Sequence, residues 1–339
     1  MEGKKLLVVH AGTHKTATTY IQNRLWLNRD KLLDGKTYLL APETRKHGRY
    51  HRFATNIAAK KNNVIRQELL AIPDDVENVI VSDERLAGVL IRQNLLEGFL
   101  KAVGRAGFRL RVVLFLRDQP DYINSLYVQE IKRFYHSETM KKYIKRCMRK
   151  RSDRFDYNEM FSGLIENPLV DVQFLPFGSG YGDPFVRLMD AQGWECSSDW
   201  NPANSQTVND QVGTKGVWLA QRVGMKLIEL GAKRSRIKGQ SRFIRIHSEK
   251  RDWSLDRYYG INKIWIKNIR KHYEISNNIF SQRIWGCQWV EKFPPYEREL
   301  NIFKLSKFEM ELQDEMNNLV DEVVESVKRE KPEAFESSE

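Results

Sequence analysis

The apolar run from Leu110 to Leu116 constrains the fold more than any other segment of this chain. Only Arg111 interrupts it, and Val112 and Val113 at its centre are β-branched. A strand without polar alternation is typical of a sheet covered on both faces, because neither side of such a strand meets water. The run therefore predicts the central strand of a parallel sheet with helices on both faces.

Four further apolar runs support this sheet. The runs are Leu6 to His10, Thr37 to Ala41, Asn78 to Ser82 and Val170 to Pro176. Helical spacing lies between them, at Thr16 to Asn28 and at Leu95 to Gly104. This alternation over the first ~180 residues predicts an α/β fold with a central parallel sheet flanked by helices.

Beyond about residue 180 the helical spacing dominates. Candidate helices span Lys215 to Leu230, Ile261 to Tyr273 and Phe308 to Val327. We expect one domain over residues 1–330, with an α/β core at about 1–180 and a mainly helical layer at about 181–330. The glutamate-rich end, residues 331–339, is expected to be a disordered tail.

Charge, cysteine content and hydropathy indicate which partners the protein can bind and in which cellular compartment we expect it. The chain has 56 Lys and Arg residues and 44 Asp and Glu residues, and its net charge of +12 favours anionic partners. Its three cysteines, Cys147, Cys196 and Cys287, form no Cys-x-x-Cys pair, so neither a disulfide scaffold nor a zinc site is expected. No stretch approaches the ~20 apolar residues that a membrane-spanning helix needs, so we expect a cytoplasmic protein.

A polar turn containing glycine joins the first strand to the first helix. Gly12 permits a tight turn, Lys15 supplies a cation, and the N–H groups at the start of the helix favour an anion. Threonine-rich turns also cap helices without any ligand, but a lysine inside such a turn favours phosphate binding. The predicted binding residues are Gly12, Thr13, His14, Lys15, Thr16, Ala17, Thr18 and Thr19.

This turn differs from a Walker A loop because the second glycine, ahead of the lysine, is missing. It resembles instead the 5'-phosphosulfate loop of bacterial sulfotransferases that use 3'-phosphoadenosine 5'-phosphosulfate (PAPS). The frame His-x-Gly-x-x-Lys-Thr-Gly/Ala-Thr-Thr-x-Ile/Leu-Gln is met from His10 to Gln22. Family members more often carry glycine where this chain has Ala17. The resemblance implies a P-loop-like sulfotransferase fold, with the 5'-phosphosulfate at residues 13–19 and Lys15 as a catalytic cation.

A second segment supports the same resemblance. Arg117 follows the central strand directly, and Ser125 lies eight residues later in a predicted helix. A guanidinium group suits a phosphate because it can donate two parallel hydrogen bonds. An apolar strand followed by Arg, Pro and a later Ser is similar to the 3'-phosphate segment of sulfotransferases. The resemblance implies that Arg117 and Ser125 bind the 3'-phosphate of PAPS, and no metal is required.

Transfer to a hydroxyl benefits from a general base, and the sequence offers two main candidates. Glu84 follows a predicted strand, where α/β sites are built, but it can also pair with Arg85. His51 has an ordinary pKa near neutrality and lies in a segment that resembles a histidine-containing family segment. We prefer Glu84, with His51 as the alternative; His14, beside Lys15, is a third contender.

The acceptor class follows mainly from the resemblance, which implies a hydroxyl of a saccharide or glycan bound by the helical region at 181–330. Two basic stretches, residues 132–154 and 225–251, form either solvated helix faces or a rim that recruits an anionic acceptor and PAPS. The tryptophans fit sugar stacking and equally fit a helical core. No specific nucleic-acid motif is present, and the oligomeric state is left open.

Two other classes of function compete with the sulfotransferase hypothesis. A kinase or NTPase could use the same loop, with Asp83 as its metal-binding aspartate. A non-enzymatic polyanion-binding protein would rest on the net charge alone and would show steep salt dependence without turnover. The missing second glycine weakens the first alternative.

Overall fold

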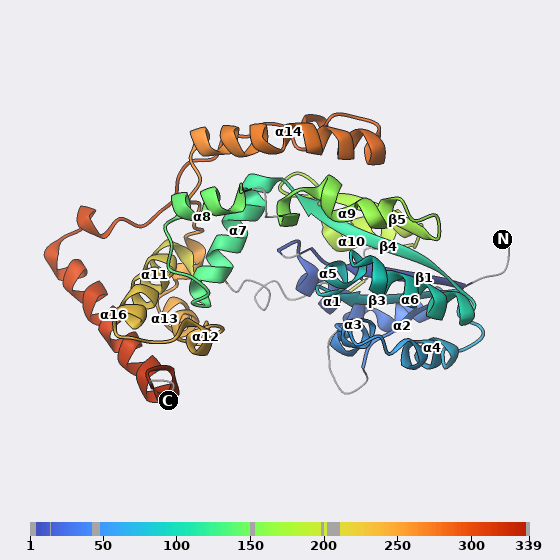
Figure 1. The fold of residues 1–339 in the computed structure, drawn as a ribbon, viewed down its shortest axis with the longest axis horizontal. Coiled ribbons are helices and arrows are strands. Elements are labelled where there is room, and N and C mark those ends of the chain that lie inside the picture. Colours follow the sequence, from blue (N-terminus) through green and yellow to red (C-terminus); the bar gives the residue numbers. More distant parts are fainter. Residues whose placement is uncertain are drawn as a thin grey trace. The chain divides into compact units, whose positions relative to one another are not determined.

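The computed structural model describes residues 5–13, 15–42, 48–149, 153–197, 200–201 and 211–336 (Figure 1). The chain divides into two compact units. Unit 1 comprises Met1–Asp118, Asp153–Val208 and Tyr273–Pro294, and unit 2 comprises Gln119–Ser152, Asn209–His272 and Pro295–Glu339. Both units are built from interleaved segments, so this division differs from the expected boundary near residue 180.

Unit 1 contains a five-stranded, all-parallel sheet, which confirms the predicted α/β fold class (Figure 1). The strand order is β2-β3-β1-β4-β5. The strands are β1 (Lys5–Ala11), β2 (Thr37–Leu39), β3 (Asn78–Asp83), β4 (Phe108–Arg117) and β5 (Val170–Phe177). β1 lies in the middle, paired with β3 through Ala11 and Asp83 and with β4 through His10 and Val113. The carboxyl ends of these three strands therefore meet at one edge of the sheet.

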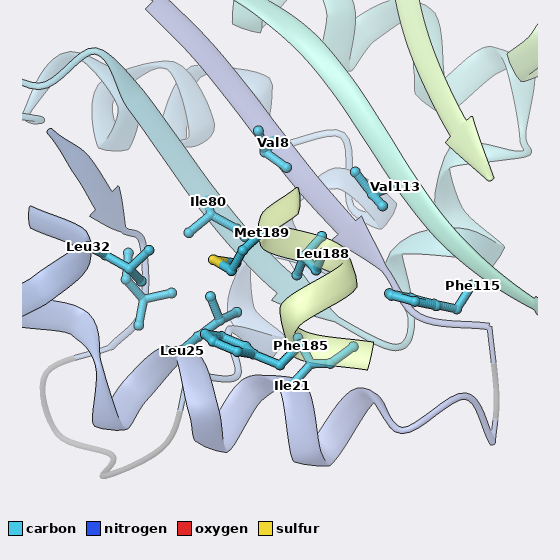
Figure 2. Close-up of a cluster of buried hydrophobic side chains, with 11 residues drawn as sticks. Val8, Ile21, Leu25, Leu32, Ile80, Val113, Phe115, Phe185, Leu188 and Met189 are labelled. Atoms are coloured by element: carbon cyan, nitrogen blue, oxygen red, sulfur yellow. The ribbon is translucent and has the colours of Figure 1, made fainter. Parts of the chain in front are cut away.

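Helices connect these strands and bury their apolar faces. The helices of unit 1 are α1 (Thr18–Leu27), α2 (Arg29–Asp34), α3 (His51–Ala58), α4 (Asn62–Leu70), α5 (Leu86–Leu90), α6 (Gln93–Arg105), α9 (Tyr157–Ile165), α10 (Pro184–Gln192) and α15 (Trp289–Lys292), with the 3-10 turn η1 (Asp153–Phe155). Figure 2 shows one core cluster, in which Ile21 and Leu25 of α1 meet Phe185 and Met189 of α10 beside Ile80 of β3. This packing fixes the start of α1 against the sheet.

Unit 2 is helical in the described residues. Its helices are α7 (Gln119–Lys132), α8 (Met140–Cys147), α11 (Gly213–Glu229), α12 (Arg234–Ile237), α13 (Arg242–Lys250) and α16 (Met310–Glu330), with the 3-10 turns η3 (Trp253–Leu255), η4 (Leu305–Lys307) and η5 (Pro332–Ala334). Helix α14 (Lys263–Trp285) begins in unit 2 and ends in unit 1. The buried residues of α16 recur every three or four positions and pack against α11, as an amphipathic helix requires.

Part of the expected tail is ordered. Residues 332–334 form η5, in which Ala334 is fully buried and its carbonyl oxygen accepts a hydrogen bond of 2.8 Å from the backbone N–H of Lys233. The sequence prediction considered only the glutamates and missed this backbone contact. Within the described parts of the chain, none of the helices combines the length and the apolar character needed to cross a membrane.

Candidate functional site

The loop between β1 and α1 is shaped by a close approach of Gly12 to Thr18. A Cβ atom at Gly12 would lie 2.2 Å from the hydroxyl oxygen of Thr18 and 3.0 Å from its Cβ. Both residues are buried, so the threonine has little room to move away. The structure thus explains why the first position of this loop needs glycine.

Two threonine hydroxyls tie the loop to the sheet. The hydroxyl of Thr13 donates to the carbonyl oxygen of Phe115 in β4 at 2.5 Å, and the hydroxyl of Thr16 donates to the carbonyl oxygen of Thr13 at 2.6 Å. Both side chains are buried. The loop is therefore fixed at the carboxyl ends of β1 and β4. His14 lies outside the described residues.

The rest of the loop contains two residues with a left-handed backbone and one buried hydroxyl group that has no hydrogen-bond partner within the described residues. Lys15 and Ala17 have positive φ angles of 69° and 59°. A left-handed backbone is unfavourable for residues with a side chain, so glycine would adopt the conformation of Ala17 with less strain. Thr18 is 6 % exposed, yet within the described residues its hydroxyl has no hydrogen-bond partner. Lys15 and Thr19 are exposed.

Arg117 reaches the same sheet edge as the loop. It is the last residue of β4, two positions beyond the carbonyl that holds Thr13. Its guanidinium carbon lies 4.8 Å from the ring centroid of Phe177, its register partner on β5. Its carbonyl oxygen accepts a hydrogen bond of 2.7 Å from the hydroxyl of Tyr157. The structure thus brings Arg117 and the lysine loop to neighbouring strand ends of unit 1.

Ser125 belongs to unit 2, where it lies half-buried in α7. The sequence predicts that Ser125 and Arg117 bind the same phosphate group. Because the two residues belong to different units, this stays a prediction.

Arg187 is a further cation near this edge that sequence reasoning missed. It lies in α10, and its side chain donates a hydrogen bond to the carbonyl oxygen of Pro176 in β5. Its guanidinium carbon lies 5.0 Å from the ring centroid of Tyr181 and 5.8 Å from that of Phe115. Burial lowers its pKa. The only hint in the sequence was Asp183-Pro184, a helix start shortly after a strand.

The carboxyl end of β3 carries a cluster of charged side chains around Asp83. Asp83 is fully buried and aligned with Ala11 of β1. Its Oδ2 atom lies 2.5 Å from Nδ1 of His51 and 3.6 Å from Nε of Arg49, and its Oδ1 atom lies 3.3 Å from Nε of Arg85. The backbone N–H of Arg85 also donates to Oδ1 at 2.7 Å. One buried carboxylate thus holds three basic side chains, including His51, the alternative candidate base.

The two candidate bases differ in their surroundings. The Oε1 atom of Glu84 lies 2.5 Å from Nη2 of Arg49, whereas the sequence suggested Arg85 as the partner of Glu84. His51 is one-third exposed, and its Nδ1 faces Asp83. Burial, with repulsion from Arg49 and Arg85, lowers the pKa of His51 despite the opposing effect of Asp83. The imidazole is therefore neutral near pH 7 and can accept a proton on Nε2.

Metal chemistry finds little support in these side chains. In the ranges that the structure describes, no three His, Cys, Asp or Glu residues are grouped so as to hold a metal ion. Asp83, the aspartate that a kinase would need, is instead surrounded by His51, Arg49 and Arg85. A cation bound there would have to displace these positive groups.

The fold and the loop together define an α/β protein whose glycine-lysine turn opens a helix at the carboxyl edge of a parallel sheet. No protein-family model, curated protein or solved structure matches this chain.

Proposed function

We propose that this chain is a sulfotransferase that moves a sulfuryl group from PAPS to a hydroxyl of a carbohydrate acceptor. The observation that carries the proposal is the hydrogen bond from Thr13 to the carbonyl of Phe115, which joins the lysine loop to the strand that ends at Arg117. Lys15 and Arg117, about a hundred residues apart, thus belong to one sheet edge. Ligands of open α/β sheets bind at this edge.

The loop residues have distinct roles in this proposal. The backbone N–H groups at the start of α1 and the unused hydroxyl of Thr18 donate to the 5'-phosphate. The acceptor oxygen bonds to sulfur as the bond from sulfur to the bridging phosphate oxygen breaks. Lys15 stabilises the negative charge that develops on that oxygen. The products are a sulfate ester and adenosine 3',5'-bisphosphate, whose 3'-phosphate Arg117 would bind; a contribution from Ser125 stays a prediction.

The surroundings of the two candidate bases favour His51 over Glu84, which reverses the preference drawn from the sequence. Asp83 orients the imidazole through Nδ1, so the proton of the acceptor hydroxyl goes to Nε2. Glu84 instead forms an ion pair with Arg49. In this arrangement Asp83 is a positioning residue and His51 is the general base.

The donor is tested by supplying PAPS or ATP with Mg²⁺ and measuring the release of adenosine 3',5'-bisphosphate from PAPS and of ADP from ATP. We expect turnover with PAPS and a mixed panel of glycans, and its near-complete loss in Lys15→Ala. Lys60→Ala is a matched control, because Lys60 is also exposed and also has a positive φ angle, of 56°. Turnover with ATP alone would overturn the proposal in favour of a kinase or NTPase.

The base is tested by the pH dependence of kcat in three variants. Since a general base acts when deprotonated, activity should rise with pH through the lowered pKa of His51 and stay level above it. Asp83→Asn removes the group that raises this pKa, so the rise should move to lower pH while kcat falls. His51→Gln should remove the rise, and Glu84→Gln should retain it. A rise that survives in His51→Gln and disappears in Glu84→Gln would restore Glu84 as the base.

The saccharide acceptor, the cytoplasmic location and the absence of a metal requirement stay predictions. A panel of cell-surface glycans labelled from PAPS would identify the acceptor.

A further inference from the structure

Unit 2 contains a pocket of about 370 Å³ that the proposed function does not use. It lies between the start of α11 and the segment 300–308. Its lining combines apolar and basic side chains: Leu300, Ile302, Phe303 and Phe308, with Lys215, Lys304 and Lys307. Thr214, Asp256 and Asn301 complete it. We call it the Lys-Phe pocket.

Backbone contacts fix the walls of the Lys-Phe pocket. Asn301 and Tyr259 form an antiparallel bridge, with N–O distances of 2.8 and 2.9 Å. The backbone N–H of Thr214 donates to the carbonyl oxygen of Asp256 at 3.0 Å. Gly213 has a φ angle of 67°, and a Cβ atom there would lie 1.7 Å from the carbonyl oxygen of Trp253. The start of α11 is thus locked against its neighbours, and the pocket is preformed.

One side of the pocket is aromatic. The rings of Phe303 and Phe308 stack with centroids 5.0 Å apart, and Trp218 meets Phe303 edge-on at 5.9 Å. Phe308 is 44 % exposed although it is a large apolar residue. A ring held by its neighbours and open to solvent offers an apolar surface to a flat ligand.

Three lysines surround this surface without a matching set of acids. The ammonium nitrogen of Lys215 lies 5.7 Å from the ring centroid of Phe303, and Lys304 and Lys307 lie on the exposed segment. In the described part of the chain, none of the three forms an ion pair. The single lining acid, Asp256, accepts hydrogen bonds from the side chains of Thr214 and Asn301. The pocket therefore carries a net positive charge.

We propose that the Lys-Phe pocket binds an acidic saccharide. The apolar face of a sugar ring lies against Phe303 and Phe308, and its carboxylate or sulfate group pairs with the lysines. The carboxylate of Asp256 and the amide oxygen of Asn301 accept hydrogen bonds from sugar hydroxyls. This ligand class uses the aromatic, cationic and acceptor groups together. An aryl anion without hydroxyls cannot donate to the remaining lone pairs of Asp256 and Asn301, and a neutral sugar cannot pair with the lysines.

The proposal concerns binding alone, so it stands or falls independently of the sulfotransferase activity. The test is calorimetric titration of the full chain with a linear hexuronic-acid trisaccharide, its neutral hexose counterpart and adenosine monophosphate. We expect only the hexuronic-acid trisaccharide to bind measurably, with an affinity that weakens as salt concentration rises. Its binding should also change the fluorescence of Trp218, which touches Phe303.

Matched variants locate the site. Lys304→Gln combined with Lys307→Gln should weaken trisaccharide binding about ten-fold, the scale expected for two partly exposed charge contacts. Lys141→Gln combined with Lys145→Gln is the control, because these exposed lysines of α8 do not line the pocket and this pair should bind normally. Absence of binding, unchanged affinity in the Lys304 and Lys307 variant, or tighter binding of adenosine monophosphate would each overturn the proposal.

Discussion

Protonation of His10 should destabilise unit 1 as the pH falls below about 6.5. His10 lies in β1 directly before the lysine loop and is completely buried. Its Nδ1 atom lies 2.8 Å from the hydroxyl oxygen of Ser82, and its ring meets Phe115 edge-on with centroids 5.8 Å apart. In the described structure Nε2 has no hydrogen-bond partner. A second proton on this ring would therefore be buried without compensation.

The size of the effect follows from the two protonation states. Burial lowers the pKa of His10 from 6.5 to about 4. The unfolded chain therefore binds a proton near pH 6.5, which the folded chain takes up only near pH 4. The stabilisation is fully present above pH 6.5 and is lost as the pH falls, at about 1.4 kcal/mol per pH unit and to a total of about 3 kcal/mol.

The assay is chemical denaturation of the wild type and of His10→Asn between pH 7 and pH 5. Asparagine keeps a polar atom for Ser82 and cannot take up the proton. The variant should be less stable at pH 7, because the smaller side chain leaves a void. Its deficit should shrink by about 2 kcal/mol by pH 5, since only the wild type loses the His10 contribution. Other titrating groups are common to both proteins and cancel. Stability curves that run parallel would refute the reasoning.

Two substitutions test the geometry of the loop. Gly12→Ala should reduce PAPS affinity strongly, because the added Cβ atom displaces Thr18. Gly163→Ala, at an open position of α9, is the control and should bind PAPS normally. Equal PAPS affinity of both variants in calorimetry would count against the close approach of Gly12 and Thr18. Ala17→Gly should raise the free energy of unfolding by up to about 1 kcal/mol, because glycine adopts the φ angle of 59° without strain. A clear loss of stability in urea denaturation of Ala17→Gly would contradict the left-handed backbone.

The sheet could be predicted because each strand is a short apolar run. The predicted runs Leu6 to His10, Asn78 to Ser82 and Val170 to Pro176 differ from the observed strands by at most one residue at each end. The helical spacing of residues 308–327 likewise matches α16, which spans Met310–Glu330. The spacing of apolar residues reflects which faces of a strand or helix are buried. Burial largely determines whether a segment forms a strand or a helix, so this spacing predicts the element.

The surroundings of the candidate base could not be predicted, since they depend on strand register and on side-chain direction. Asp83 is the last residue of β3 and is fully buried, whereas Glu84 lies in the turn that follows and its side chain is about one-third exposed. The sequence shows two consecutive acids but not which of them faces His51. The partners of Arg49 and Arg85 depend on the same choice, whereas the preference for Glu84 rested on its place after a predicted strand.

Net charge does not by itself locate the proposed anion-binding surfaces. Four of the nine basic side chains of the stretch 225–251 form ion pairs within unit 2: Lys226 with Asp321, Arg242 with Glu330, Arg245 with Glu249 and Arg251 with Glu315. Each pair reduces the field that its cation presents to a ligand. The lysines of the Lys-Phe pocket lie outside both basic stretches, in a part of the sequence without a charge run. A basic side chain can attract an anionic ligand only where no carboxylate of the protein is paired with it. Whether such a carboxylate lies nearby depends on tertiary contacts and cannot be read from composition.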